Sequence, residues 1–242
     1  MMTEKNQALL EETLQKSGVE ADHTQLVLGM GGAGIRLAEE LAEALGRMVQ
    51  QPVTVSAMDS DSCAVQPGRN VFLLKGTLPG GITGAGAAGD RRLAHLWMME
   101  QLEALTRWIT PLMQLQKPLD IWLTAGMGGG TGSGCLLSMA YLVRHVTADM
   151  AGVTLRCCLT MPGLTSGWPN LVVKQLETNS RRSVQELAYC VNLPAADQVD
   201  HQLDNRPLLD GCWLRDSSEK WQPVGGSREA LGELLARTDS SC

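Results

Sequence analysis

A run of closely spaced glycines near the middle of the chain constrains the fold more than any other feature. Residues 126–134 contain six glycines, with Thr131 and Ser133 between them. An apolar run typical of a buried strand, 120–124, precedes the glycines, and residues 135–146 carry apolar side chains at helical spacing. Glycines at such a turn let backbone amides curl around an anion, and the helix start adds unpaired N–H groups. The pattern predicts a phosphate-binding loop rather than a flexible turn.

Two further glycine-rich turns follow predicted strands. The short apolar run 25–28 leads into G-x-G-x-x-G at 29–34, and helical spacing then continues to Met48. The run 71–74 leads into the glycine-rich segment 76–89. Carboxyl ends of parallel strands meet at one edge of a sheet, so the three loops are expected to converge on a single polyphosphate.

The remaining periodicity predicts an α/β protein without internal repeats. Strands are predicted at 53–57 and 153–160, and helices at 4–16, at 90–109 with a stop at Pro111, and at 171–188 with a possible division at 179–180. The inward face of the helix 90–109 is predicted to carry Leu93, Leu96, Trp97, Leu102, Leu105 and Trp108. Residues 1–22 are interpreted as a helical extension and 23–242 as one domain, whose part after about residue 190 is irregular, with helix character only at 229–236.

Charge and cysteine usage exclude several function classes. The chain has 242 residues, a formal net charge of −6 and no basic block longer than a pair, so nucleic acid is not an expected partner. Seven cysteines without C-x-x-C spacing are typical of reduced thiols in the cytoplasm. No apolar run approaches a membrane span, and the first residues lack a signal-peptide core, so we expect a cytoplasmic protein without membrane insertion. The four histidines are scattered, which argues against a zinc site.

The glycine loops together resemble those of the tubulin/FtsZ family. Residues 124–134 resemble its central phosphate loop, 29–34 its first loop, 57–60 its second and 84–87 the third loop that senses the γ-phosphate. Further along the chain, 183–187 and 203–209 are also similar to tubulin. The similarity extends from about residue 25 to residue 209.

The resemblance implies a fold, a ligand and a set of binding residues. The fold would be a Rossmann-like three-layer parallel sheet of the GTPase-domain type, lacking the second, activation domain. The ligand would be GTP or GDP with Mg²⁺, and the protein would associate with itself or with a longer tubulin/FtsZ-like protein in a filament-related role. The nucleotide-binding residues implied by the resemblance are Gly31, Gly32, Ala33, Gly34, Asp59, Gly84, Ala85, Gly86, Ala87, Gly128, Gly129, Gly130, Thr131, Gly132, Ser133 and Asn205, the last as a guanine contact.

Departures from the family pattern bear on hydrolysis and on affinity. In the family, the catalytic acid comes from a loop beyond the helix that follows this domain, and no counterpart is found before Cys242, so we expect GTP hydrolysis to be low or partner-dependent, with no catalytic residue in this chain. Arg36 stands where FtsZ-type proteins carry an asparagine near the base, and Ala88 replaces a commonly polar residue. The segment 161–164 lacks the ribose-binding acid of the family.

Two other interpretations remain open at the level of sequence. A dinucleotide-binding enzyme would use Gly29, Gly31 and Gly34 for NAD or FAD, with Asp59 on the ribose, but it leaves the central glycines unexplained. A nucleotide-free adaptor derived from the same fold is compatible with the departures at Arg36 and Ala88.

The absence of a lysine after the central glycines means that a bound phosphate would be neutralised by amides, helix dipoles and Mg²⁺.

Overall fold

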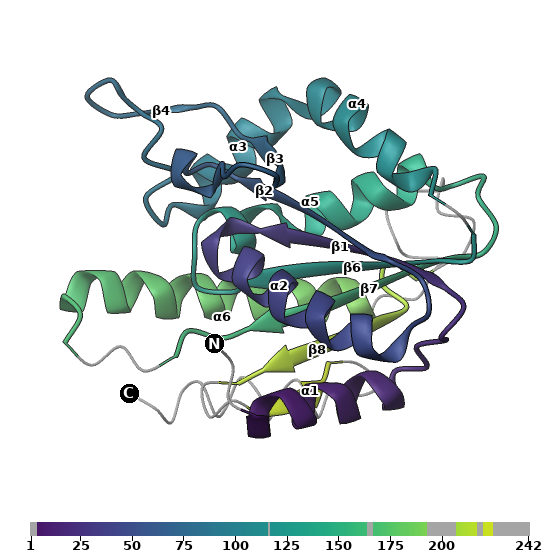
Figure 1. The fold of residues 1–242 in the computed structure, drawn as a ribbon. Helices are drawn as coiled ribbons and strands as arrows, with labels where there is room; N and C mark the ends of the chain where they lie inside the picture. Colours follow the sequence, from purple (N-terminus) through teal and green to yellow (C-terminus); the bar gives the residue numbers. More distant parts are fainter. Residues whose placement is uncertain (1–3, 116, 164–166, 193–206, 217–219, 225–242) are drawn as a thin grey trace.

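A central parallel sheet organises the molecule (Figure 1). The computed structural model describes residues 4–115, 117–163, 167–192, 207–216 and 220–224. The strands are β1 (Thr24–Met30), β2 (Val53–Asp59), β3 (Asn70–Leu73), β6 (Leu119–Gly126), β7 (Val153–Thr160), β8 (Gly211–Arg215) and β9 (Trp221–Pro223). Their order is β3-β2-β1-β6-β7-β8-β9, and every pair is parallel except β8 with β9. The predicted α/β class with a Rossmann-like parallel sheet is confirmed.

Helices cover both faces of this sheet. They are α1 (Glu4–Lys16), α2 (Gly31–Met48), α3 (Arg91–Glu100), α4 (Leu102–Met113), α5 (Thr131–Val146) and α6 (Asn170–Asn192), with a 3₁₀ turn at Ser62–Ala64. A two-stranded hairpin, β4 (Thr77–Leu78) with β5 (Ile82–Thr83), projects from the body ahead of α3 (Figure 1). None of the helices in the described ranges has the length and apolar composition that a bilayer span requires.

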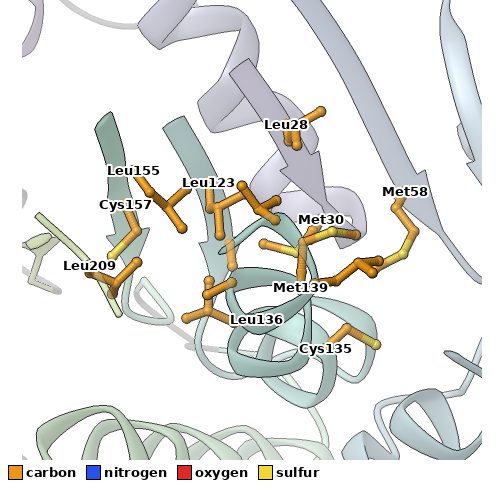
Figure 2. Packing of buried hydrophobic residues seen from close by; sticks show 14 of the residues in the cluster. Leu28, Met30, Met58, Leu123, Cys135, Leu136, Met139, Leu155, Cys157 and Leu209 are labelled. Atoms are coloured by element: carbon orange, nitrogen blue, oxygen red, sulfur yellow. The ribbon is translucent and has the colours of Figure 1, made fainter. Parts of the chain in front are cut away.

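Successive side chains of the central strands point to opposite faces of the sheet, and each face packs against a separate hydrophobic core. On β6, Leu119, Ile121, Leu123 and Ala125 point to one face, where they pack with α3, α4, α5 and α6. Figure 2 shows this cluster, in which Leu136 and Met139 of α5 lie among residues of β1, β6 and β7. The intervening Trp122 points to the opposite face, where the smaller core of α1 and α2 covers it. The continuous burial of β6 is typical of a central parallel strand.

The helix predicted at 90–109 is two helices. Asp90 accepts hydrogen bonds from the amides of Arg92 and Leu93 and so caps α3, but α3 ends at Glu100. Gln101 interrupts the helix because its side chain bonds both the N–H and the C=O of Lys75. The predicted stop at Pro111 is wrong, since α4 continues through that proline to Met113.

Three further expectations are corrected by the tertiary contacts. Leu96 was expected to face inward, but its side chain is 51% exposed. The helix α6 runs through residues 179–180 without a division, because Asn179 and Ser180 direct their polar groups to nearby carbonyls. The part after residue 190 is not wholly irregular, since β8 and β9 extend the sheet there. The helix predicted at 229–236 lies outside the described residues.

An ion pair between a buried arginine and a partly exposed aspartate anchors β8 to the rest of the domain. Arg144 of α5 is 1% exposed and donates to the carbonyl of Leu208 at 3.0 Å and to the carboxylate of Asp210 at 2.8 Å. The same Asp210 oxygen accepts the amide of Leu155 in β7 at 2.7 Å. These contacts fix the segment that enters β8, which local periodicity does not reveal.

Candidate functional site

The predicted glycine loops meet at one cavity, at the carboxyl ends of β1, β2 and β6. Its volume is about 240 Å³. The lining comes from four segments of the chain and consists of Met30, Gly31, Gly32, Ala33, Asp59, Ser60, Asp61, Ala85, Gly86, Ala87, Ala88, Gly89, Gly126, Gly129, Gly130, Thr131 and Gly132. Two helices begin at this cavity, α2 at Gly31 and α5 at Thr131. Each helix start contributes N–H groups without partners inside the helix and a partial positive charge.

The first and central loops approach each other closely at two glycines. Gly31 has a φ of +69°, in the left-handed region that favours glycine. A Cβ atom on Gly31 would lie 2.9 Å from the amide nitrogen of Gly132, and one on Gly132 would lie 2.8 Å from the carbonyl oxygen of Met30. The two helix starts can lie side by side only because neither residue carries a side chain.

A buried carboxylate joins the second loop to the central loop. Asp59 is 5% exposed, and its Oδ1 accepts hydrogen bonds from the Ser60 amide at 2.7 Å and the Thr131 hydroxyl at 3.0 Å. The Ser60 and Thr131 hydroxyls are 2.8 Å apart, and Ser60 Oγ also accepts the amide of Ala87 at 2.9 Å. Burial raises the pKa of Asp59 above its ordinary value, and the hydrogen bonds from Ser60 and Thr131 oppose that shift. Three loops are therefore held in register by one polar cluster.

Several backbone N–H groups of the lining are free to bind an anion. Within the described ranges, the amides of Ala88, Gly89 and Gly130 form no hydrogen bond with a protein acceptor. Buried or partly buried amides in folded proteins are nearly always paired, with protein, water or ligand. Unpaired amides in a glycine-rich loop beside the start of a helix are an arrangement that binds phosphate groups.

Two lining glycines have room for a side chain and yet carry none. A Cβ atom on Gly129 would meet nothing within 4 Å, and one on Gly32 would meet only Nη1 of Arg36, at 3.9 Å. Neither residue has a positive φ, so backbone strain does not require glycine there. The protein's own packing therefore leaves the space beside these two residues to something else.

The charged groups around the cavity are unevenly distributed. The lining contains the carboxylates of Asp59 and Asp61 and, within the described chain, no lysine, arginine or histidine. Arg36 lies one turn beyond Gly32 on α2, is exposed and forms no ion pair with the described residues. Its guanidinium lies beside the cavity, because a Cβ atom on the lining residue Gly32 would be 3.9 Å from Nη1 of Arg36. A polyanion bound in this cavity would therefore contact backbone amides of the lining, whereas the guanidinium of Arg36 lies outside the lining.

The structure divides the residues predicted from the sequence into two groups. Those that line the cavity are Gly31, Gly32, Ala33, Asp59, Ala85, Gly86, Ala87, Gly129, Gly130, Thr131 and Gly132. Gly34, Gly84, Gly128 and Ser133 are not among the lining residues. A Cβ atom on Gly34 would be 2.4 Å from the carbonyl oxygen of Thr124, and Ser133 donates its hydroxyl to the carbonyl of Gly129. Asn205 lies outside the described residues.

Sequence reasoning missed several lining positions. Met30, Ser60, Asp61, Ala88, Gly89 and Gly126 line the cavity without having been assigned to it. Ser60 and Asp61 directly follow β2, two residues longer than the predicted strand 53–57, so their position near a strand end was the available signal. Gly126 is the first glycine of the predicted central loop, and a Cβ atom on it would lie 2.6 Å from Cβ of Ala33 in the first loop.

Comparisons with known proteins agree with this geometry. A family model described as tubulin-like matches residues 92–220. Among solved structures, a GTPγS-bound CetZ2 protofilament from Haloferax volcanii superposes with a TM-score of 0.56 at 19% identity, covering 89% of this chain and 56% of that one. The GDP-bound CetZ1 monomer from Haloferax volcanii gives 0.54 at 18% identity, with 88% and 57% covered.

A third similar structure comes from another organism. It is a GTPγS-form protofilament of TubZ from Bacillus thuringiensis serovar israelensis, with a TM-score of 0.54 at 14% identity, covering 86% of this chain and 51% of that one. The chain thus spans little more than half the length of these structures. No curated protein sequence matches it. At such identities the structural matches establish a shared fold.

Proposed function

Since the chain belongs to the tubulin-like family, we propose that its cavity binds a guanine nucleotide, GTP or GDP, together with Mg²⁺. The bound nucleotide would control association of the protein with copies of itself or with a longer tubulin/FtsZ-like protein. The observation that carries the proposal is the set of unpaired amides in the third loop and just ahead of α5, beside two glycines, Gly32 and Gly129, whose side-chain space is empty. A polyphosphate is the ligand whose charge and shape satisfy both features.

The acidic residues of the second loop suit a hard cation. Oδ1 of Asp59 accepts three hydrogen bonds, from Ser60, Asp61 and Thr131, whereas Oδ2 takes part in no hydrogen bond with the described residues. Mg²⁺ is typically held by one or two carboxylates together with phosphate oxygens and water. Asp59 and Asp61 would hold the ion, which when bound would neutralise charge on the phosphates.

Hydrolysis by these residues alone is expected to be weak or absent. Stabilising a transferring phosphoryl group requires cations and a positioned water or base. The hydroxyls of Ser60 and Thr131 are engaged with each other and with Asp59, and the described lining has no basic side chain. The site would therefore act as a binding site whose hydrolysis depends on a partner.

Association is proposed from the relatives. The CetZ2 and TubZ structures that this chain resembles are protofilaments with GTPγS. If this chain associates in a similar nucleotide-dependent way, light scattering and sedimentation of the purified protein should change with GTP. GDP should have the smaller effect.

Calorimetric titration with GTP, GDP, ATP and NAD, with and without Mg²⁺, tests the ligand. We expect guanine-selective binding that Mg²⁺ strengthens. Gly129→Ala should weaken it at least tenfold, about 1.4 kcal/mol, because the new methyl group occupies the space left for the phosphates. Gly46→Ala is the matched control: Gly46 lies on the exposed side of α2, a Cβ there meets nothing within 4 Å, and its binding should equal that of the wild type.

Each alternative has its own outcome in this experiment. Binding of NAD in preference to GTP would replace the proposal with the dinucleotide interpretation. The absence of heat with all four ligands would favour a nucleotide-free adaptor. Unchanged GTP affinity in Gly129→Ala would refute the placement of the phosphates beside the central loop.

A further inference from the structure

The helix α6 contacts the two most glycine-rich loops of the cavity through a single buried side chain. Asn179 is 6% exposed, and its Nδ2 donates to the carbonyl oxygens of Gly89 at 2.8 Å, Gly128 at 3.0 Å and Gly129 at 3.3 Å. Gly89 belongs to the third loop, and the other two belong to the central loop. Asn179 itself is not part of the cavity lining.

The packing around Asn179 shows that α6 is seated directly on these loops. A Cβ atom on Gly128 would lie 2.5 Å from Cγ of Pro162, and 3.2 Å from both Cδ2 of Leu176 and Oγ of Ser180. One on Gly89 would lie 3.0 Å from Nε2 of Gln175. The glycines therefore admit the helix on one side, while the cavity lies on the other.

The orientation of the peptide groups connects Asn179 to the ligand side. In a trans peptide, the C=O of one residue and the N–H of the next point in opposite directions. Holding the carbonyls of Gly128 and Gly129 toward α6 therefore turns the N–H groups of Gly129 and Gly130 away from it. These two residues line the cavity, and the amide of Gly130 has no acceptor among the described residues.

The third loop is fixed in the same manner. Asn179 holds the carbonyl of Gly89, and the following amide, that of Asp90, closes a turn onto the carbonyl of Ala87 at 2.8 Å. A second contact supports the arrangement, because Arg91, which begins α3, pairs with Glu186 of α6 and donates to the carbonyl of Ser133 at 3.1 Å. The helix α6 thus sets the spacing between the third and central loops.

We propose that Asn179 is the positioning residue that presents the amides of the central loop to the phosphates, by holding the carbonyls of both loops against α6. The expected effect on nucleotide affinity rests on the proposed function. The loop arrangement itself is a property of the ligand-free protein. The two parts can therefore be measured separately.

The test compares Asn179→Asp with Gln185→Glu. Both variants replace an amide by a carboxylate on α6, but Gln185 is exposed and forms no hydrogen bond with the described loop residues. Asn179→Asp removes both N–H donors and sets a negative charge against three carbonyls. We expect GTP–Mg²⁺ affinity at pH 8 to fall about tenfold or more in Asn179→Asp, because buried hydrogen bonds to the loop carbonyls are lost and a negative charge faces them. Gln185→Glu should bind within about twofold of the wild type.

The pH profile separates positioning from general destabilisation. Protonation of the new carboxyl group restores one O–H donor and removes its charge, so the affinity of Asn179→Asp should partly recover between pH 8 and a mildly acidic pH. The wild type and Gln185→Glu should change in parallel over the same range. An affinity loss in Asn179→Asp that does not depend on pH would overturn the proposal.

Hydrogen exchange without nucleotide provides the second readout. Peptides covering residues 84–90 and 127–134 should exchange faster in Asn179→Asp than in Gln185→Glu, while peptides from β1 and β6 remain unchanged. If Asn179→Asp does not fold, Asn179→Ala, which removes the donors without adding charge, is measured in the same way. Equal loop exchange in the Asn179 variant and the control would refute the positioning role, whereas lack of GTP binding by the wild type would refute only the proposed ligand.

Discussion

Replacing Gly134 with alanine tests whether the central loop is shaped by packing as well as by its ligand. Gly134 lies in the first turns of α5, where alanine has the higher helix propensity by about 1 kcal/mol. A Cβ atom there would lie 2.2 Å from the carbonyl oxygen of Arg91 and 2.9 Å from its carbonyl carbon. Real Cβ atoms almost never approach within 3.0 Å of such an atom, so the carbonyl oxygen of Arg91 at the start of α3 would have to move by roughly 0.8 Å, the difference between 3.0 Å and 2.2 Å.

The expected loss follows from these opposing terms. Overpacking against a rigid backbone costs about 3 kcal/mol at the upper end of the usual range, and the gain in helix propensity offsets about 1 kcal/mol of it. Gly134→Ala should therefore lower the free energy of unfolding by about 2 kcal/mol, which in a chain of this size corresponds to a decrease in Tm of roughly 4–8 °C.

The assay is urea unfolding followed by circular dichroism, with thermal melting as a second measure. Gly46→Ala is again the control, because the same change on α2 meets no neighbouring atom and should stabilise the protein by about 0.5–1 kcal/mol. Equal or higher stability of Gly134→Ala relative to Gly46→Ala would show that the close approach of α3 to α5 is not a constraint.

Two other substitutions test the buried charges. Asp59→Asn keeps the Oδ1 acceptor that Ser60 contacts; since burial raises the pKa of Asp59 above its ordinary value of 3.8, the charged form costs stability at neutral pH and the protonated form does not. The variant should therefore equal or exceed the wild type in urea unfolding at pH 7, and the difference should shrink as the pH falls through the raised pKa of Asp59 and be lost below about pH 4; a deficit at pH 7 that disappears in acid would contradict this assignment. Arg144→Met should lower the free energy of unfolding by about 2 kcal/mol, because it removes the hydrogen bonds of a buried guanidinium to Leu208 and to the partly exposed Asp210. Asp210→Asn should cost less in this variant than in the wild type, and purely additive losses in the double variant would show that the pair is not coupled.

Most of the sheet could be predicted because its signals are local. The strand β7 matches the predicted range 153–160, and α1 matches the range 4–16, since each has an uninterrupted apolar pattern with clear ends. The strands β8 and β9 escaped prediction because they are short and polar in context, and because their stability comes from β7 and from the ion pair of Arg144 with Asp210. Likewise, the break at Gln101 depends on a hydrogen-bond partner, Lys75, that is distant in the sequence.

The sequence predicted which loops form the candidate site, but not what each residue of those loops contacts. Glycine spacing indicated which loops would meet, but not that Gly34 faces the backbone of β6 while Gly129 faces open space. The role of Asp59 in joining loops depends on Thr131, 72 positions away in the sequence. Asn179 carries no motif of its own, so its contact with both loops is visible only in the folded molecule.

The sequence by itself determined the alternation of strands, glycine turns and helices, and with it the parallel sheet and the edge at which the loops gather. These follow from periodicity and from the chain direction of parallel strands, which are properties of neighbouring residues. The tertiary structure alone decided which glycines admit a neighbouring backbone and which leave space for a ligand. It also decided which side chain orients the loop amides, because each of these depends on how closely segments some 50 to 90 residues apart approach one another, as Asn179 does with Gly128 and Gly89.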